Sequence, residues 1–145
     1  MKTKFTSLVK LKKSTMQKSE RLVQKANADL NSASIALKIS YDSLKDVEAP
    51  LSGNMLDFLA SRTLLDSQRG LIKHNNEWVF YAKGQVEAAK EQFKLDTMEH
   101  EKFKYLELEE IKKEIKKLKA QEAKDLDEVA LMTYEKKNKM KKDKV

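Results

Sequence analysis

The sequence predicts an all-α protein, folded as a long antiparallel two-helix coiled-coil hairpin. Three observations predict this fold. The 145 residues are 37% charged and only 7% aromatic, and lysine, glutamate, leucine and alanine dominate, as is typical of long helices. Apolar residues recur with a seven-residue period in two separate segments. The only proline, Pro50, lies between these segments.

The first helix is expected over about residues 3–48. One of its rows is entirely apolar: Val9, Met16, Val23, Leu30, Leu37 and Leu44. The companion row is mostly small: Phe5, Lys12, Ser19, Ala26, Ala33, Ser40 and Val47. These rows have the spacing of the a and d positions of a coiled-coil seam, and the small row allows a partner helix to approach closely.

The turn of the hairpin is expected over residues 49–54. Pro50 has no backbone N–H and disfavours continuation of a helix, whereas Ser52 is a residue type that can cap the next one. A short connection makes consecutive helices antiparallel neighbours. A regular fold-back would bring position 23 close to position 80.

The second helical segment is expected over about residues 55–138, with a basic tail over residues 136–145. Its larger row is Leu51, Phe58, Leu65, Ile72, Val79, Val86, Phe93 and His100. Its companion row is Asn54, Ser61, Gln68, Asn75, Ala82, Ala89, Asp96 and Phe103. The pattern then predicts a slip of about one residue, to a stripe that starts with Leu108, Ile111, Ile115 and Leu118.

Two glycines leave an alternative open at the tip of the hairpin. Gly70 and Gly84 each cost about 1 kcal/mol inside a helix. The segment is therefore either one long rod or is broken near residue 70, with short helices at the tip.

Positive charge is concentrated at the two ends of the chain. The net charge is +7, of which residues 1–19 contribute +6 and residues 136–145 contribute +5. Basic ends of this kind either keep a protein soluble or attract phosphate, anionic lipid or an acidic protein surface. The chain has no cysteine and no apolar run near the ~20 residues of a membrane span, so a cytosolic protein is expected.

The sequence predicts no catalytic, cofactor-binding or metal-binding residue, and therefore no enzyme. No second histidine or cysteine lies four residues after His74 or His100 to complete a metal-binding face, and the adjacent carboxylates Glu109 and Glu110 point apart on a helix. No glycine-rich phosphate loop is present.

One aromatic cluster stands out, in the stretch EWVFYAK. Trp78, Phe80 and Tyr81 flank the seam position Val79. Two interpretations stay open: the rings pack against the first helix, or they form a docking patch for another protein.

The C-terminal stretch EHEKFKYLELEEIKKEIKKLKAQEAKDLDEVALMTY resembles the FliJ family of flagellar export proteins. The match includes a leucine–acid–acid–hydrophobic–alanine signature at residues 126–130. The opening KTKFTSLVKLKKSTMQKSE also looks like the start of that family.

This resemblance implies a stalk and adaptor of type III export, at the inner face of the cytoplasmic membrane at the flagellar base. The implied partners are the hexameric export ATPase FliI, the cytoplasmic domain of the export-gate protein FlhA, and export chaperones. The positions that correspond to the family's gate-binding surface on the second helix are Leu64, Gln68, Leu71 and Asn75. The lysines expected to strengthen ATPase binding are Lys10, Lys12, Lys13, Lys136, Lys137, Lys139, Lys141 and Lys142.

Two alternatives to this role remain. One is a general coiled-coil chaperone or interaction protein. The other is a protein that binds nucleic acid or a membrane surface through its lysine-rich ends, with an affinity that falls steeply with salt.

Overall fold

The computed structural model describes residues 2–47 and 53–143 of the chain. It has two helices, α1 (Thr6–Lys45) and α2 (Met55–Asp143), and the described residues contain no strand. The predicted all-α two-helix hairpin is confirmed. The chain groups into two units, one of residues 12–99 and one that combines residues 1–11 with residues 100–145.

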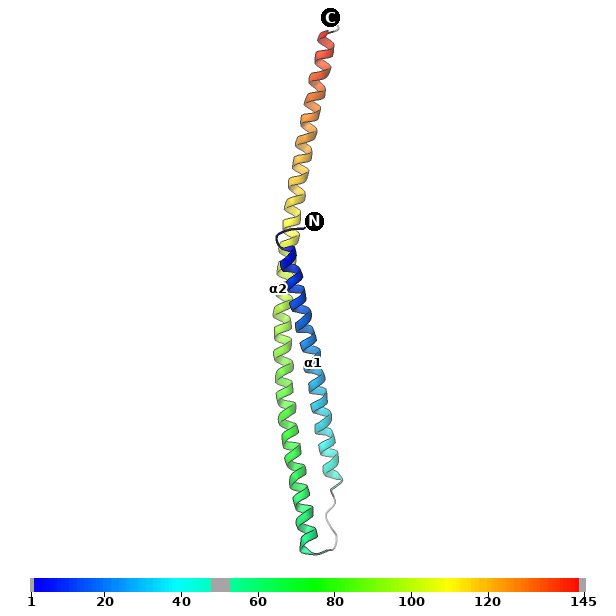
Figure 1. Ribbon diagram of the computed structural model, residues 1–145, viewed down its shortest axis with the longest axis vertical. Coiled ribbons are helices and arrows are strands. Elements are labelled where there is room, and N and C mark those ends of the chain that lie inside the picture. The colour runs from blue at the N-terminus through cyan, green and yellow to red at the C-terminus, as the bar shows by residue number, and fades with distance from the viewer. Residues whose placement is uncertain (1, 48–52, 144–145) are drawn as a thin grey trace. The chain divides into compact units, whose positions relative to one another are not determined.

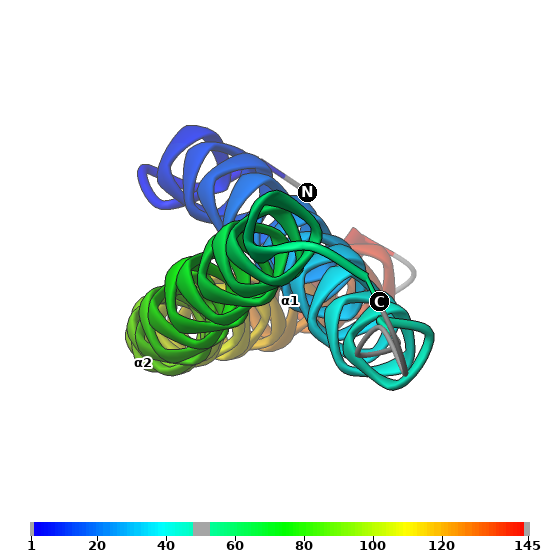
Figure 2. The same ribbon diagram turned by 90° about the horizontal axis from the view of Figure 1, so that it is seen from below.

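In the unit of residues 12–99, α1 and α2 lie next to each other and run in opposite directions (Figures 1 and 2). The buried apolar side chains all belong to the predicted seam rows: Ala26, Ala33, Ile72, Ala82 and Val86. Alanine dominates because two helix backbones that approach closely leave room only for small side chains. Along the described chain, neither helix has a stretch apolar and long enough to cross a membrane.

Polar pairs fix how α1 and α2 are aligned. The Ser19 hydroxyl donates to the Asp96 carboxylate, and the Lys12 ammonium lies 3.6 Å from the Glu99 carboxylate. Because Ser19 faces Asp96, Val23 lies about one turn further along, near Gln92. The regular fold-back that would place position 23 near position 80 is therefore wrong.

The start of α2 has a well-defined cap. The Asn54 side-chain oxygen accepts a hydrogen bond from the backbone N–H of Asp57 at 3.1 Å, and the Asn54 carbonyl accepts from the same group at 3.1 Å. Gly53 has φ 153°, and a Cβ there would lie 2.6 Å from an Asp57 carboxylate oxygen, so a larger residue would strain the backbone and displace the Asp57 side chain. The expected break at Pro50 and cap at Ser52 lie outside the described residues.

The first turns of α2 extend past the end of α1. The seam positions Asn54 and Phe58 are exposed because α1 ends at Lys45 and does not reach them. This leaves an apolar group open at the tip: Met55, Leu56, Phe58 and Leu59. The helix continues through Gly70 without a break, so the alternative of short tip helices is not found.

In the unit of residues 1–11 and 100–145, the start of the chain packs on α2. The Thr3 hydroxyl accepts from the Phe5 N–H at 3.1 Å, and the Thr6 hydroxyl accepts from the Thr3 N–H at 2.8 Å, which caps α1. The Phe5 and Phe103 rings lie 6.5 Å apart. This contact holds the first turn of α1 on α2.

The predicted slip of the apolar stripe after Phe103 is wrong. Glu107, Glu110 and Glu114, at the original seven-residue spacing, are half-buried. Of the predicted shifted stripe, Ile111 is half-buried. Leu108, Ile115 and Leu118 are exposed, at 50%, 41% and 52%. The residues that border Glu110 and Glu114 are Lys2, Thr3 and Lys4, which precede α1.

Candidate partner-binding surfaces

The four residues expected to bind the export gate lie in two environments. Leu64 and Leu71 are exposed, at 56% and 46%. Gln68 donates to the Ser40 carbonyl at 2.9 Å, and the buried Asn75 donates to the Ala36 carbonyl at 3.3 Å. Gln68 and Asn75 therefore join the two helices and present little surface to a partner.

The exposed surface of this region is formed by Leu71 and two of the aromatic residues, Trp78 and Tyr81. Their side chains are 46%, 39% and 64% exposed. His74, Trp78 and Tyr81 line one depression, and Tyr81 reaches a second, of about 410 Å³, that α1 borders with Leu22. We call Leu22, Leu71, Trp78 and Tyr81 the aromatic face. The exposure of its two rings favours the docking interpretation over complete packing against α1.

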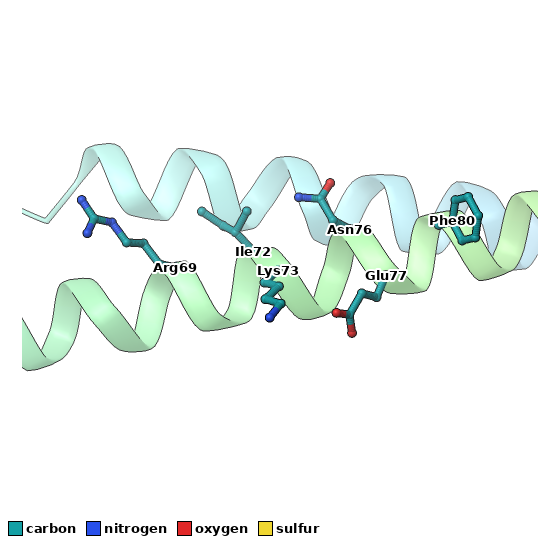
Figure 3. Close-up of a pocket in the computed structure, with 6 residues that line it drawn as sticks. All are labelled: Arg69, Ile72, Lys73, Asn76, Glu77 and Phe80. Atoms are coloured by element: carbon teal, nitrogen blue, oxygen red, sulfur yellow. The ribbon is translucent and has the colours of Figure 1, made fainter.

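Phe80 lies on the opposite flank of α2 and is 81% exposed. It borders a shallow depression of about 420 Å³ together with Arg69 and Lys73 (Figure 3). Ile72 forms the floor and points toward α1, whereas Lys73 projects away from it. The two flanks of the hairpin thus differ, because aromatic and aliphatic groups gather on one and charges surround a single ring on the other.

The lysines expected to bind the ATPase are mostly open to solvent. Lys10 and Lys13 are exposed, whereas Lys12 is half-buried beside Glu99. In the tail, all five are exposed: Lys136, Lys137, Lys139, Lys141 and Lys142. The tail belongs to a longer stretch, residues 115–142, in which every residue of α2 is exposed.

The basic start of the chain lies against acidic residues of α2. Lys2, Thr3 and Lys4 border a depression of about 310 Å³ together with Glu110 and Glu114. Sequence reasoning missed this arrangement because it treated the N-terminal lysines as a free basic patch. The signal that could have found it is the regular heptad spacing of the glutamates after Phe103.

Comparison with known families agrees with this architecture. The family model described as "Flagellar FliJ protein" matches residues 1–139. The chain belongs to the FliJ family. No curated protein and no solved structure matches this FliJ-family chain. Its membership makes it a flagellar export-related protein.

Proposed function

We propose that this FliJ-family chain is a non-enzymatic stalk and adaptor of the flagellar type III export apparatus. Family membership supports the link to flagellar export. The observation that carries the stalk role is the exposed stretch of α2 over residues 115–142, which ends in the lysines of the tail. A single helix, about 10–12 Å across with its side chains, is slender enough to enter the opening of a ring.

The ring in this proposal is the FliI hexamer. Exposed lysines near the end of α2 are drawn toward an acidic bore, and this attraction weakens as salt rises. The protein then works in the cytoplasm at the inner face of the membrane, where its partners hold it at the flagellar base.

The test is stimulation of FliI ATP hydrolysis at low salt. A chain that ends at Tyr134 should stimulate less than the full chain, and so should replacement of the five tail lysines by glutamate. Replacement by arginine should preserve stimulation, because it keeps the charge. The matched control reverses five exposed lysines of the hairpin: Lys38, Lys73, Lys83, Lys90 and Lys94. Equal stimulation by the full chain and the chain ending at Tyr134 would refute the role of the tail.

The adaptor role is assigned to the aromatic face. Trp78 and Tyr81 provide large, rigid apolar surface of the kind that dominates binding energy at protein interfaces. Trp78→Ala with Tyr81→Ala should weaken binding to the cytoplasmic domain of FlhA about tenfold or more. Phe80→Ala, on the other flank, is the control and should bind as the unmodified chain does. Equal binding by all three proteins would remove the aromatic face from the proposal.

The exposed lysines and the open apolar surface also favour two other candidates. A lysine-dependent binder of nucleic acid or anionic membrane would lose affinity when the tail is removed, whether or not FliI is present. A general chaperone, or a carrier of export chaperones, would bind through the aromatic face and would not need the tail. Binding of FliI that depends on the tail, together with binding of FlhA that depends on Trp78, favours the stalk and adaptor over both.

A further inference from the structure

One face of α2 carries no charged residue over a long distance. Its members recur at three- and four-residue steps, all are exposed, and none is Asp, Glu, Lys or Arg: Leu64, Ser67, Leu71, His74, Trp78, Tyr81, Gln85, Ala88, Gln92 and Leu95. We call these residues the uncharged row. It is about 47 Å long, in a chain of which 37% of the residues are charged. Because charged residues are depleted at the cores of protein interfaces, the row has the composition of a surface that a partner protein covers.

A carboxylate lies beside the two aromatic rings of this row. Glu77, Trp78 and Tyr81 line one depression, of about 390 Å³, together with His74. The four residues span only about 10 Å of the helix. Glu77 is exposed and projects away from α1 (Figure 3). The depression thus combines two exposed rings with a negative charge.

The cations of this chain leave the depression open. No ion pair among the described residues includes Glu77. Lys73 precedes Glu77 by one turn, but it borders the depression of Phe80 on the other flank. In the part of the chain that the structure describes, lysines lie over two phenylalanine rings, and no cation lies over Trp78 or Tyr81. A cation that fills the depression would therefore come from another molecule.

Two rings beside a carboxylate favour a guanidinium group as that cation. A guanidinium is planar, stacks on aromatic rings and pairs with a carboxylate through two N–H groups. The phosphates of nucleic acid or of an anionic lipid would instead be repelled by Glu77. We propose that the depression binds an arginine side chain of a partner protein, while the uncharged row packs on the apolar residues around that arginine. The inference names the chemistry of the contact at the proposed adaptor site, and it rests on that proposal for the identity of the partner.

The fluorescence of Trp78 tests the depression directly, because Trp78 is the only tryptophan of the chain. The probe is N-acetyl-arginine amide, and its neutral isostere N-acetyl-citrulline amide is the control. Both are titrated into the full-length protein at constant ionic strength. The arginine compound should give a saturating change in emission that Glu77→Lys removes, and the citrulline compound should give none. Equal responses to the two compounds, including none to either, or an unchanged response in Glu77→Lys, would overturn the proposal.

Binding to the cytoplasmic domain of FlhA tests the same contact in a complex. Glu77→Gln should weaken binding about fivefold, because it removes the charge and keeps the shape. The matched control is Glu87→Gln, which removes the same charge from an exposed position seven residues after Phe80 and should bind as the unmodified chain does. Trp78→Leu should weaken binding about threefold or more, whereas Trp78→Phe keeps an aromatic ring and should bind nearly as well as the unmodified chain.

The outcomes separate the arginine site from the adaptor role. If Trp78→Ala with Tyr81→Ala lowers FlhA binding and Glu77→Gln does not, the adaptor role stands and the arginine site is wrong. Equal binding by Trp78→Leu and Trp78→Phe also rejects the arginine site. If the paired alanine variant binds FlhA as the unmodified chain does, the adaptor role fails, and the fluorescence titration, which contains only this chain, decides the arginine site.

Discussion

Asn75 donates a hydrogen bond from its side-chain amide to the hydroxyl of Ser40, and both side chains are buried between α1 and α2. The Ser40 hydroxyl in turn donates to the Ala36 carbonyl at 2.8 Å. About two turns away from Asn75 on α2, Gln68 donates to the Ser40 carbonyl. These hydrogen bonds join Ala36 and Ser40 of α1 to Gln68 and Asn75 of α2. A shift of either helix along the other would leave buried polar groups without partners.

A charge at Asn75 should destabilise the hairpin. Asn75→Asp replaces the donating amide by a carboxylate that faces the Ser40 hydroxyl and the Ala36 carbonyl. The expected loss in the free energy of unfolding is about 3 kcal/mol, as for other uncompensated buried charges. The control, Asn76→Asp, makes the same chemical change at the adjacent exposed position. Urea unfolding followed by circular dichroism measures both, and equal losses would contradict the buried hydrogen bond of Asn75 to Ser40.

The seam can be tested in the same way on α1. Leu37 lies in the larger seam row and is half-buried, whereas Lys38 is exposed. Leu37→Asp should remove about 3 kcal/mol or more and melt much of α1, since the new carboxylate has no partner there. Lys38→Asp should change the helix content little. Similar helix loss in the two variants by circular dichroism would show that the seam rows are misassigned.

Ser19 should contribute to stability through Asp96. Its hydroxyl donates to one carboxylate oxygen, while the Gln92 side chain donates to the other at 3.0 Å. Ser19→Ala removes the donor from a half-buried carboxylate, so we expect a loss of about 1–2 kcal/mol in thermal or urea unfolding. Ser14→Ala, at an exposed position of the same helix, should be near neutral. A neutral Ser19→Ala would mean that water replaces the hydroxyl without cost.

Much of the fold could be predicted because apolar and small residues recur every seven positions along each helix. Most buried and half-buried residues between Phe5 and Val47 fall on the predicted rows, and Thr6, Ala36 and Ser43 are the exceptions. The alignment of the two helices could not be predicted, because it depends on how far α2 extends past α1 at the tip. Heptads that repeat along both helices fit one another at several alignments. Polar contacts between the helices, such as those of Ser40 with Asn75 and of Ser19 with Asp96, select one alignment.

The partner surfaces were harder to predict than the seam. The resemblance to the family pointed to four positions on the second helix, and two of them, Gln68 and Asn75, bridge to α1. A one-dimensional pattern does not say whether an amide at a seam position faces the partner helix or solvent. Trp78 and Tyr81 were visible in the sequence as an aromatic cluster, but their exposure depends on the backbones of α1 and α2 lying close together at small residues such as Ala33 and Ala82.

The last prediction measures the alignment of the two helices directly. Lys25 and Ala88 are exposed residues that border the same depression between α1 and α2. Spin labels at cysteines introduced at these positions should therefore lie close together.

The fold-back expected from the sequence would instead bring position 25 close to position 78. Labels at positions 25 and 77 test that alternative, since Glu77 is exposed and lies about 16 Å nearer the start of α2 than Ala88. In double electron–electron resonance, with unlabelled protein added in excess to dilute contacts between chains, the 25–77 distance should exceed the 25–88 distance by roughly 10 Å. A shorter distance for the 25–77 pair would mean that α2 does not extend past α1 at the tip, and the polar pairs of Ser40 with Asn75 and of Ser19 with Asp96 would then not form.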